Sequence, residues 1–299
     1  MNEINFGVHW LSFTIHASRE AAFTIYELLF KDQFGDLEEL GHGGRGFKEI
    51  FHSLLDFKIY LTPAYETEDE YFHYEIPGQA CELISWKIYQ GLEGLLSGNF
   101  INKYNYTRID LAFDNCPFIP LQVEEAIKQG EVRSLAKRES LEVHKSPFML
   151  KDNGEEGTQT INFGSRSSER MIRVYDKRGF TRLELELKEK RADLVAKELF
   201  QANDISQWYG LMIGHLRDFV DFDASWWNEF TGSKGRAWAT VSTPKEIEIG
   251  KLLNWLDRQV MPALSVAIDT QPVEVIDMLV ERGRKRRGDK YNLLLEKTE

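Results

Sequence analysis

Three short segments of the chain alternate apolar and charged residues, and this alternation constrains the fold most. They are TRIDLAFD at 107–114, MIRVYDK at 171–177 and RLELELK at 182–188. Side chains along a β-strand point to opposite faces in turn, so each segment predicts a strand with one apolar and one polar face. If the three strands belong to one sheet, their apolar faces cover a core and their polar faces form one charged surface.

The rest of the pattern mixes helices with strands. Residues 6–16 are rich in aromatic and β-branched residues, as strands are, whereas 18–31 and 79–97 repeat apolar residues at helical spacing. We therefore expect an α+β domain over residues 1–202, with a largely antiparallel sheet and flanking helices. Strand signals then fade, and we expect residues 203–299 to form a mainly helical C-terminal region with a basic tail.

Composition narrows the class of protein. The formal net charge of -11 argues against a non-specific nucleic-acid coat, although it allows a local basic surface. The two cysteines, Cys81 and Cys116, form no C-x-x-C motif and indicate neither a disulfide framework nor a zinc site. The N-terminus does not resemble a signal peptide, and no apolar run approaches the ~18 residues of a membrane span. We expect a cytoplasmic protein that does not enter the membrane.

The predicted polar faces gather acidic side chains. Asp110 and Asp114 lie on the first strand, and Glu184 and Glu186 lie on the third. Hard divalent ions such as Mg²⁺ or Mn²⁺ prefer carboxylate oxygens, so the four residues are candidate metal ligands. The alternative is a solvated face, which alternation alone favours for RLELELK. For TRIDLAFD the two interpretations are balanced, because Asp is depleted in strands.

Tyr175 lies on the polar face of the second predicted strand, together with Arg173 and Lys177. A tyrosine in a strand usually packs with its hydroxyl hydrogen-bonded, so the strand pattern by itself favours a structural role. The aromatic pair Trp208 and Tyr209 raises a similar choice between stacking of unpaired bases and core packing, and core packing is favoured.

The segment INFGSRSSERMIRVYDKRGFTRLELELK at 161–188 resembles the core signature of the Rep_trans replication initiation factor family. TRIDLAFD and the segment HYEIPGQACELI at 73–84 are similar to upstream parts of that family, GHGGRGFKEIF at 41–51 matches more weakly, and LDRQVMPALSVAI at 256–268 is similar to its C-terminal helix. The family includes initiators of rolling-circle plasmids and of some filamentous phages, and relaxases of some conjugative elements. The resemblance implies an HUH-like α+β sheet.

The resemblance also implies a bacterial enzyme that nicks and rejoins one strand of origin DNA, either single-stranded or in supercoiled duplex. Tyr175 falls on the position of the family's nucleophile. Its hydroxyl would attack a phosphodiester and leave a 5′-phosphotyrosine and a free 3′-hydroxyl. A divalent metal would polarise the phosphate, and we rank Asp110 and Glu184 highest as its ligands or as the base. A host helicase and a second copy of the chain are the partners that the resemblance implies.

Basic side chains are the candidates for contacts with phosphate. Lys177 would contact the scissile phosphate or lower the pKa of Tyr175, while Arg173 and Arg182 would hold flanking phosphates. The basic run RGRKRRGDK ends a predicted helix, and phosphate binding is favoured there over a solvated helix terminus. The proposed DNA contacts are Arg108, Arg166, Arg173, Arg284, Lys285, Arg286 and Arg287.

The better-known rolling-circle initiators carry a His-hydrophobe-His metal motif, and this chain has none. Rep_trans proteins are similar in lacking that motif. Each of its histidines, His9 among them, lacks a partner at ligand spacing and is expected to be an ordinary polar residue. Four alternatives remain: a relaxase with the same chemistry, a noncatalytic DNA-binding regulator, a nuclease that uses activated water, and attack by another tyrosine, Tyr104 or Tyr106.

Overall fold

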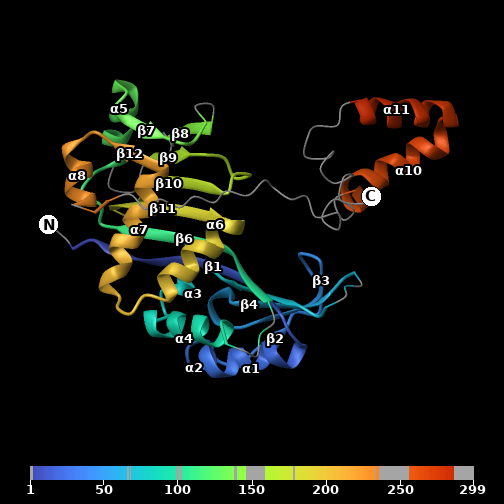
Figure 1. Ribbon diagram of the computed structural model, residues 1–299, viewed down its shortest axis with the longest axis horizontal. Helices are drawn as coiled ribbons and strands as arrows, with labels where there is room; N and C mark the ends of the chain where they lie inside the picture. Colours follow the sequence, from blue (N-terminus) through green and yellow to red (C-terminus); the bar gives the residue numbers. More distant parts are fainter. Residues whose placement is uncertain are drawn as a thin grey trace, which may run out of the picture. The chain divides into compact units, whose positions relative to one another are not determined.

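The computed structural model describes residues 3–65, 67, 69–98, 101, 103–137, 140–145, 159–177, 179–232, 234–235 and 256–285. The chain divides into two compact units, Met1–Ala239 and Thr240–Glu299 (Figure 1). The first unit therefore extends past the boundary near residue 203 that the fading strand pattern suggested. The physical reason is the helix after that boundary, which buries Trp208, Met212 and Phe219 in the core of the first unit.

One antiparallel sheet, in which the strands do not follow their order in the sequence, forms the centre of the first unit. In the described residues it has ten strands in the order β2-β3-β4-β5-β1-β6-β11-β10-β9-β8. The strands are β1 Asn5–His16, β2 Glu38–Glu39, β3 Phe47–His52, β4 Lys58–Pro63, β5 Phe72–Ile76, β6 Lys103–Asp114, β8 Leu141–Lys145, β9 Gln159–Phe163, β10 Arg170–Lys177 and β11 Phe180–Lys188. A separate two-stranded sheet pairs β7 (Val132–Ser134) with β12 (Val220–Phe222).

The three amphipathic strands of the sequence are neighbours in this sheet, as predicted. β11 pairs with β6 on one side and with β10 on the other, and both pairs are antiparallel. The apolar residues Ile109, Leu111 and Leu185 are buried in the core, so the opposite faces of the same strands form one polar surface. The α+β class with a largely antiparallel sheet and flanking helices is confirmed.

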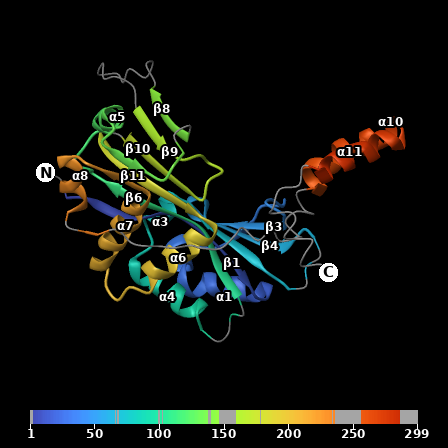
Figure 2. The same cartoon turned by 45° about the horizontal axis from the view of Figure 1, so that its top comes forward.

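Helices cover the apolar face of the sheet. The helix α6 lies against β6 and β11, and both α4 and α7 pack against α6 (Figure 2). Ala192, Val195 and Leu199 of α6 are buried because they recur on one side of the helix. The helices of this unit are α1 Arg19–Leu29, α2 Lys31–Phe34, α3 Gly78–Cys81, α4 Trp86–Leu96, α5 Pro120–Gln129, α6 Glu189–Phe200, α7 Ser206–Phe219 and α8 Ser225–Thr231, with a short 3₁₀ turn at Leu54–Asp56.

The described part of the second unit is helical, as predicted for the C-terminal region. A π-helical turn, Leu256–Val260, leads into α10, Met261–Thr270, and α11 follows at Val273–Lys285. Pro262 lies in the first turn of α10, where its missing N–H leaves no bond unmade. Among the described residues, every helix is too short or too polar to cross a membrane.

Candidate active site on the polar face of the sheet

Strand pairing brings the predicted site residues together on the polar face. Tyr175 of β10 is the cross-strand partner of Arg182 of β11, and Arg173 is the partner of Glu184. On its other side, Glu184 faces Ala112 of β6. The small Ala112 side chain leaves space above Glu184, so longer side chains from neighbouring strands can reach its carboxylate.

Tyr175 and Glu184 form the central contact of this surface. The Tyr175 hydroxyl donates a hydrogen bond of 2.9 Å to Oε1 of Glu184. Tyr175 is half-buried, and Glu184 is only 2% exposed. Burial, and then the negative charge of Glu184, raises the pKa of Tyr175 well above its ordinary value. The free protein therefore holds this tyrosine as a neutral phenol whose proton points at a carboxylate.

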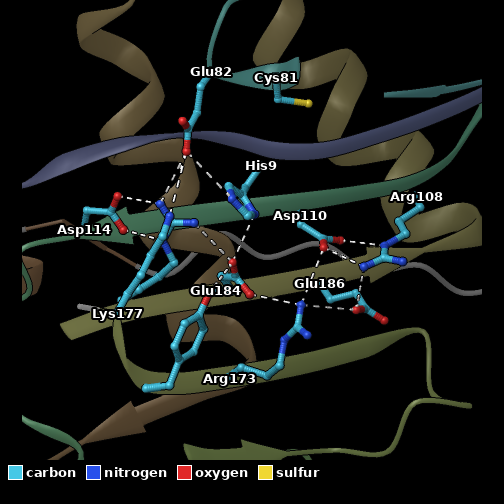
Figure 3. Close-up of polar contacts among 12 residues, drawn as sticks. His9, Cys81, Glu82, Arg108, Asp110, Asp114, Arg173, Lys177, Glu184 and Glu186 are labelled. Atoms are coloured by element: carbon cyan, nitrogen blue, oxygen red, sulfur yellow. Dashed lines mark hydrogen bonds and ion pairs between the residues drawn. The ribbon is translucent and has the colours of Figure 1, made fainter. Parts of the chain in front are cut away.

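Hydrogen-bond donors and cations around Glu184 keep it ionised. Nη2 of Arg173 lies 3.0 Å from its Oε2, and Nδ1 of His9 lies 3.1 Å from its Oε1 (Figure 3). Nη1 of Arg182 lies 3.6 Å from the same Oε1. Burial by itself would raise the pKa of Glu184, but the hydrogen bond from His9 and the charge of Arg173 outweigh it and lower the pKa to about 2.

A β-bulge brings His9 to this site. Val8 of β1 pairs with Leu111 of β6, and Trp10 pairs with Asp110, so His9 is an extra residue without a partner across the pair. A bulge redirects the side chain of the extra residue, and here it turns His9 toward Glu184. His9 is expected from the sequence to be an ordinary polar residue rather than a metal ligand, and its contact with Glu184 is a role that the sequence pattern did not predict. The signal in the sequence is the break in alternation, because apolar residues at 6, 8 and 10 are followed by apolar residues at 11, 13 and 15.

Arg182 is held by the carboxylate of Asp114. The two side chains form a bidentate pair, and Arg182 is only 2% exposed. Burial would lower the pKa of Arg182, but the hydrogen bonds to Asp114 raise it above its ordinary value, so the guanidinium stays charged. Lys177 lies on the same side of the site, with its Nζ 3.8 Å from Glu82, which follows α3 (Figure 3). Lys177 is not among the groups that set the pKa of Tyr175, and that pKa is raised rather than lowered.

The remaining carboxylates form a second cluster around Arg108. Its guanidinium donates to both oxygens of Asp110, at 2.9 and 2.7 Å, and to Glu186 at 3.0 Å. Nη2 of Arg173 lies 3.8 Å from each of these two carboxylates. The prediction that the polar face of RLELELK is solvated is wrong for β11, because Glu184 and Glu186 are both buried. Buried carboxylates need partners, and arginines supply them here.

The four predicted metal ligands therefore do not converge on one point. Asp114 pairs with Arg182, Asp110 and Glu186 pair with Arg108, and the cation that approaches Glu184 is the guanidinium of Arg173. Among the described residues, no three His, Cys, Asp or Glu side chains are grouped as metal ligands would be. The oxygen donors suit Mg²⁺ chemically, but this arrangement does not fit a metal site.

The candidate DNA contacts fall in several places. Arg108 and Arg173 belong to the carboxylate clusters, and the Arg108 guanidinium also lies over the ring of Trp10. Arg166 is exposed in the loop between β9 and β10. Arg284 and Lys285 are exposed at the end of α11 in the second unit, while Arg286 and Arg287 lie outside the described residues.

The two alternative tyrosines face another partner. The hydroxyls of Tyr104 and Tyr106 each donate to Glu93 of α4, at 2.9 Å. Because α4 belongs to the helical layer over the apolar face, these hydroxyls lie away from the Glu184 site. The observed contacts favour Tyr175 over both as the tyrosine of the polar surface.

The fold and this surface together define a sheet-borne site that gathers a tyrosine, a buried carboxylate and arginines. The family described as replication initiation factor, Rep_trans, matches residues 104–282, and the chain belongs to this family. Tyr175, Glu184 and their arginine partners lie inside the matched range, whereas His9 lies before it.

Two known proteins are similar. The putative DNA relaxase NicK of Bacillus subtilis (strain 168) is 25% identical over 221 residues, which are 64% of this chain and 61% of that protein. The matched region thus spans less than two thirds of the relative. A solved structure, the rolling circle replication initiator protein from Geobacillus stearothermophilus, superposes with a TM-score of 0.63 at 22% identity, over 78% of this chain and 98% of that one. This likeness establishes the shared fold.

Proposed function

We propose that this chain nicks and rejoins one strand of origin DNA through a 5′-phosphotyrosine on Tyr175, and so starts rolling-circle replication. The observation that carries the proposal is the Tyr175 hydroxyl, which donates to an ionised and buried Glu184. A phenol needs a base close to its proton in order to attack phosphorus at neutral pH, and Glu184 is that base. Membership of the replication initiation factor family supports the same chemistry.

The bonding changes balance in a single displacement. Oη of Tyr175 bonds to phosphorus, the P–O3′ bond breaks, and the phenol proton passes to Glu184. The leaving 3′-oxygen takes a proton from water, which becomes hydroxide, and forms the 3′-hydroxyl that primes synthesis. Rejoining is the same path in reverse: the 3′-hydroxyl gives its proton to hydroxide and attacks phosphorus, the bond between phosphorus and Oη of Tyr175 breaks, and Glu184 returns the proton to Tyr175.

Substrate binding would make Glu184 a better base. The hydrogen bond from His9 and the charge of Arg173 now keep its pKa low, but a phosphodiester is an anion that competes for the guanidinium groups of Arg173 and Arg182. As these cations turn toward phosphate, the pKa of Glu184 rises toward its ordinary value and the carboxylate accepts the tyrosine proton more readily. The same guanidinium groups, with Lys177, would stabilise the charge that develops at phosphorus.

A covalent-adduct assay tests the proposal. Single-stranded oligonucleotides tiled across the DNA element that encodes the chain are incubated with protein and either Mg²⁺ or Mn²⁺, then separated under denaturing conditions. We expect one oligonucleotide to give a protein–DNA adduct that Tyr175→Phe abolishes. Cleavage without an adduct would identify a nuclease that uses water. DNA binding with neither product would identify a regulator.

A relaxase that starts conjugative transfer is the second candidate function, because the chain is similar to a putative DNA relaxase. Its chemistry is the same, and the recognised site separates the two functions. The proposal also includes three further points. The reaction requires Mg²⁺ or Mn²⁺, the chain acts with a host helicase, and it forms a homodimer. A cytoplasmic location in a bacterium is also part of the proposal.

A further inference from the structure

A cavity of about 540 Å³ opens beside the Tyr175 site, at the first half of β1. It exists because β5 pairs with β1 only from Leu11 onward, which leaves the strand edge before Leu11 without a neighbour on that side. α3 packs against β1, where Gly78 lies close to the ring of His9, and the residues that follow it up to the start of α4 form the other wall of the cavity. The volume lies within the roughly 300–1,000 Å³ of ordinary ligand pockets.

The walls of this cavity are aromatic. Trp86 and Tyr89 of α4 line it together with Trp208 of α7, and the ring centroids of Tyr89 and Trp208 are 5.9 Å apart. The preference for core packing of Trp208 is confirmed, since the residue is only 3% exposed. It packs in the core and also presents part of its indole to the cavity.

Two buried donors on the wall have no hydrogen-bond partner. They are Nε1 of Trp208 and Nη1 of Arg182, and both residues are more than nine-tenths buried. Buried polar atoms are nearly always bonded. Nη1 of Arg182 still has the Glu184 carboxylate 3.6 Å away, so the N–H of Trp208 is the donor that is left for a ligand with an acceptor atom. His9, Lys177 and Arg182 also line the cavity, which connects it to the Tyr175 site.

The floor of the cavity is made of small residues. Gly7 of β1 pairs with Ala112 of β6, and both line the cavity. A Cβ added at Gly7 would meet no atom within 4 Å. The backbone at Gly7 does not adopt a left-handed conformation, so a larger residue would fit the strand and project into the space.

We propose that this cavity binds one unpaired base of the DNA strand, next to the scissile phosphate. Aromatic walls stack bases of any type, and a buried donor bonds to an acceptor atom on a base edge. Arg182 connects the two sites, because it lines the cavity and is the cross-strand partner of Tyr175. A base held there would fix the phosphodiester in front of the tyrosine. The identity of the ligand as DNA rests on the proposed function.

Ligand-observed NMR tests the cavity without requiring any cleavage. The full chain is mixed with each of the four deoxynucleoside monophosphates, and transfer of saturation from the protein to the base protons is measured. We expect the wild type to bind at least one nucleotide. We expect Gly7→Leu to bind it with an affinity lower by a factor of about ten or more, because stacking in the cavity is lost. Deoxyribose 5-phosphate is the control for phosphate, and we expect it not to displace the bound nucleotide at equal concentration.

Two further variants control the experiment. Gly94→Leu makes the same substitution at an exposed glycine of α4 that also has no atom within 4 Å of an added Cβ, and it should bind nucleotide as the wild type does. Trp208→Phe keeps an aromatic ring but removes the unpartnered N–H, and it should bind more weakly even if Gly7→Leu fails to fold.

The outcomes separate this inference from the proposed function. No nucleotide binding, equal binding by folded Gly7→Leu, or displacement by deoxyribose 5-phosphate would overturn the base site, whether or not the wild type forms an adduct. Nucleotide binding that Gly7→Leu abolishes would support the base site. If the wild type bound nucleotide in this way but gave no adduct with any oligonucleotide, the nicking proposal would fail and the base site would stand.

Discussion

The hydroxyl of Tyr175 lies 2.9 Å from Oε1 of Glu184, and the two residues belong to neighbouring antiparallel strands. The same oxygen lies 3.1 Å from Nδ1 of His9. One carboxylate oxygen therefore joins the candidate nucleophile to a histidine on the far side of β6. This relation suggests that Glu184 has two roles: it accepts the tyrosine proton, and it fixes the position of the hydroxyl.

Replacement of Glu184 by glutamine tests the first role. Glu184→Gln keeps the shape and a hydrogen bond but removes the charge that accepts the proton. We expect the rate of adduct formation to fall by about 10²–10⁴, the usual contribution of a general base. We also expect the pKa of Tyr175 to fall, because the negative charge of Glu184 helps to raise it. A spectroscopic titration of tyrosine, with Glu184→Gln and Tyr175→Phe compared against the wild type, measures this shift.

Acid stability should carry the signature of Glu184. Its pKa is about 2 in the folded chain and about 4.3 when unfolded, so the charged form stabilises the fold above the unfolded value. That contribution, about 3 kcal/mol at most, is lost as the pH falls from about 5 through 2. Denaturant unfolding at pH 7 and pH 3 should therefore show a smaller loss in Glu184→Gln than in the wild type. An equal loss in both proteins would mean that Glu184 is not held ionised.

His9 should act as a positioning residue. In His9→Ala the Glu184 carboxylate loses a hydrogen bond, and we expect slower adduct formation. In His9→Gln the amide can donate to the same oxygen, so part of the rate should return. A merely structural role would slow both variants in proportion to their loss of stability, as followed by thermal unfolding. Failure of glutamine to restore any rate in a stable protein would contradict the positioning role.

The Arg182–Asp114 pair should matter for stability. Asp114→Asn leaves a buried guanidinium without its bidentate carboxylate, which typically costs about 3–5 kcal/mol. Glu142→Gln is the matched control, because Glu142 pairs with His144 on the exposed β8, and it should change the free energy of unfolding little. Chemical denaturation measures both, and similar losses in the two variants would refute the account of a buried, dependent arginine.

The sequence predicted the sheet and its polar face because alternation determines which side chains share a face. It brought Tyr175, Arg173, Arg182 and Glu184 onto one surface, and the structure has them there. Alternation does not reveal whether the polar face is buried, however, because a strand with a solvated polar face has the same sequence pattern. The pairing of the carboxylates with arginines depends on strand order and register, which a single segment does not contain.

His9 shows a second limit of such patterns. A bulge inserts one residue and shifts the faces of the strand from that point on. The strand 6–16 still looks regular by composition, so only the change in its alternation after Trp10 discloses the shift. A motif search for paired histidines also misses it, because the partner of His9 is a glutamate on another strand.

The proposed metal requirement should appear only with DNA. The carboxylates already pair with arginines, so Mg²⁺ or Mn²⁺ should leave the melting temperature of the free chain unchanged. We expect a chelator to abolish adduct formation and Mn²⁺ to restore it. A clear rise in melting temperature when metal is added to the free chain would show a preformed metal site and contradict the arrangement of Arg173 among the carboxylates.

The most direct measurement locates the covalent bond itself. The adduct is trimmed with nuclease and protease, and the peptide that carries the nucleotide is sequenced by mass spectrometry. We predict a single nucleotide linked through its 5′-phosphate to Tyr175, in the segment that spans β10. Linkage to Tyr104, Tyr106 or any other residue, or through a 3′-phosphate, would contradict it.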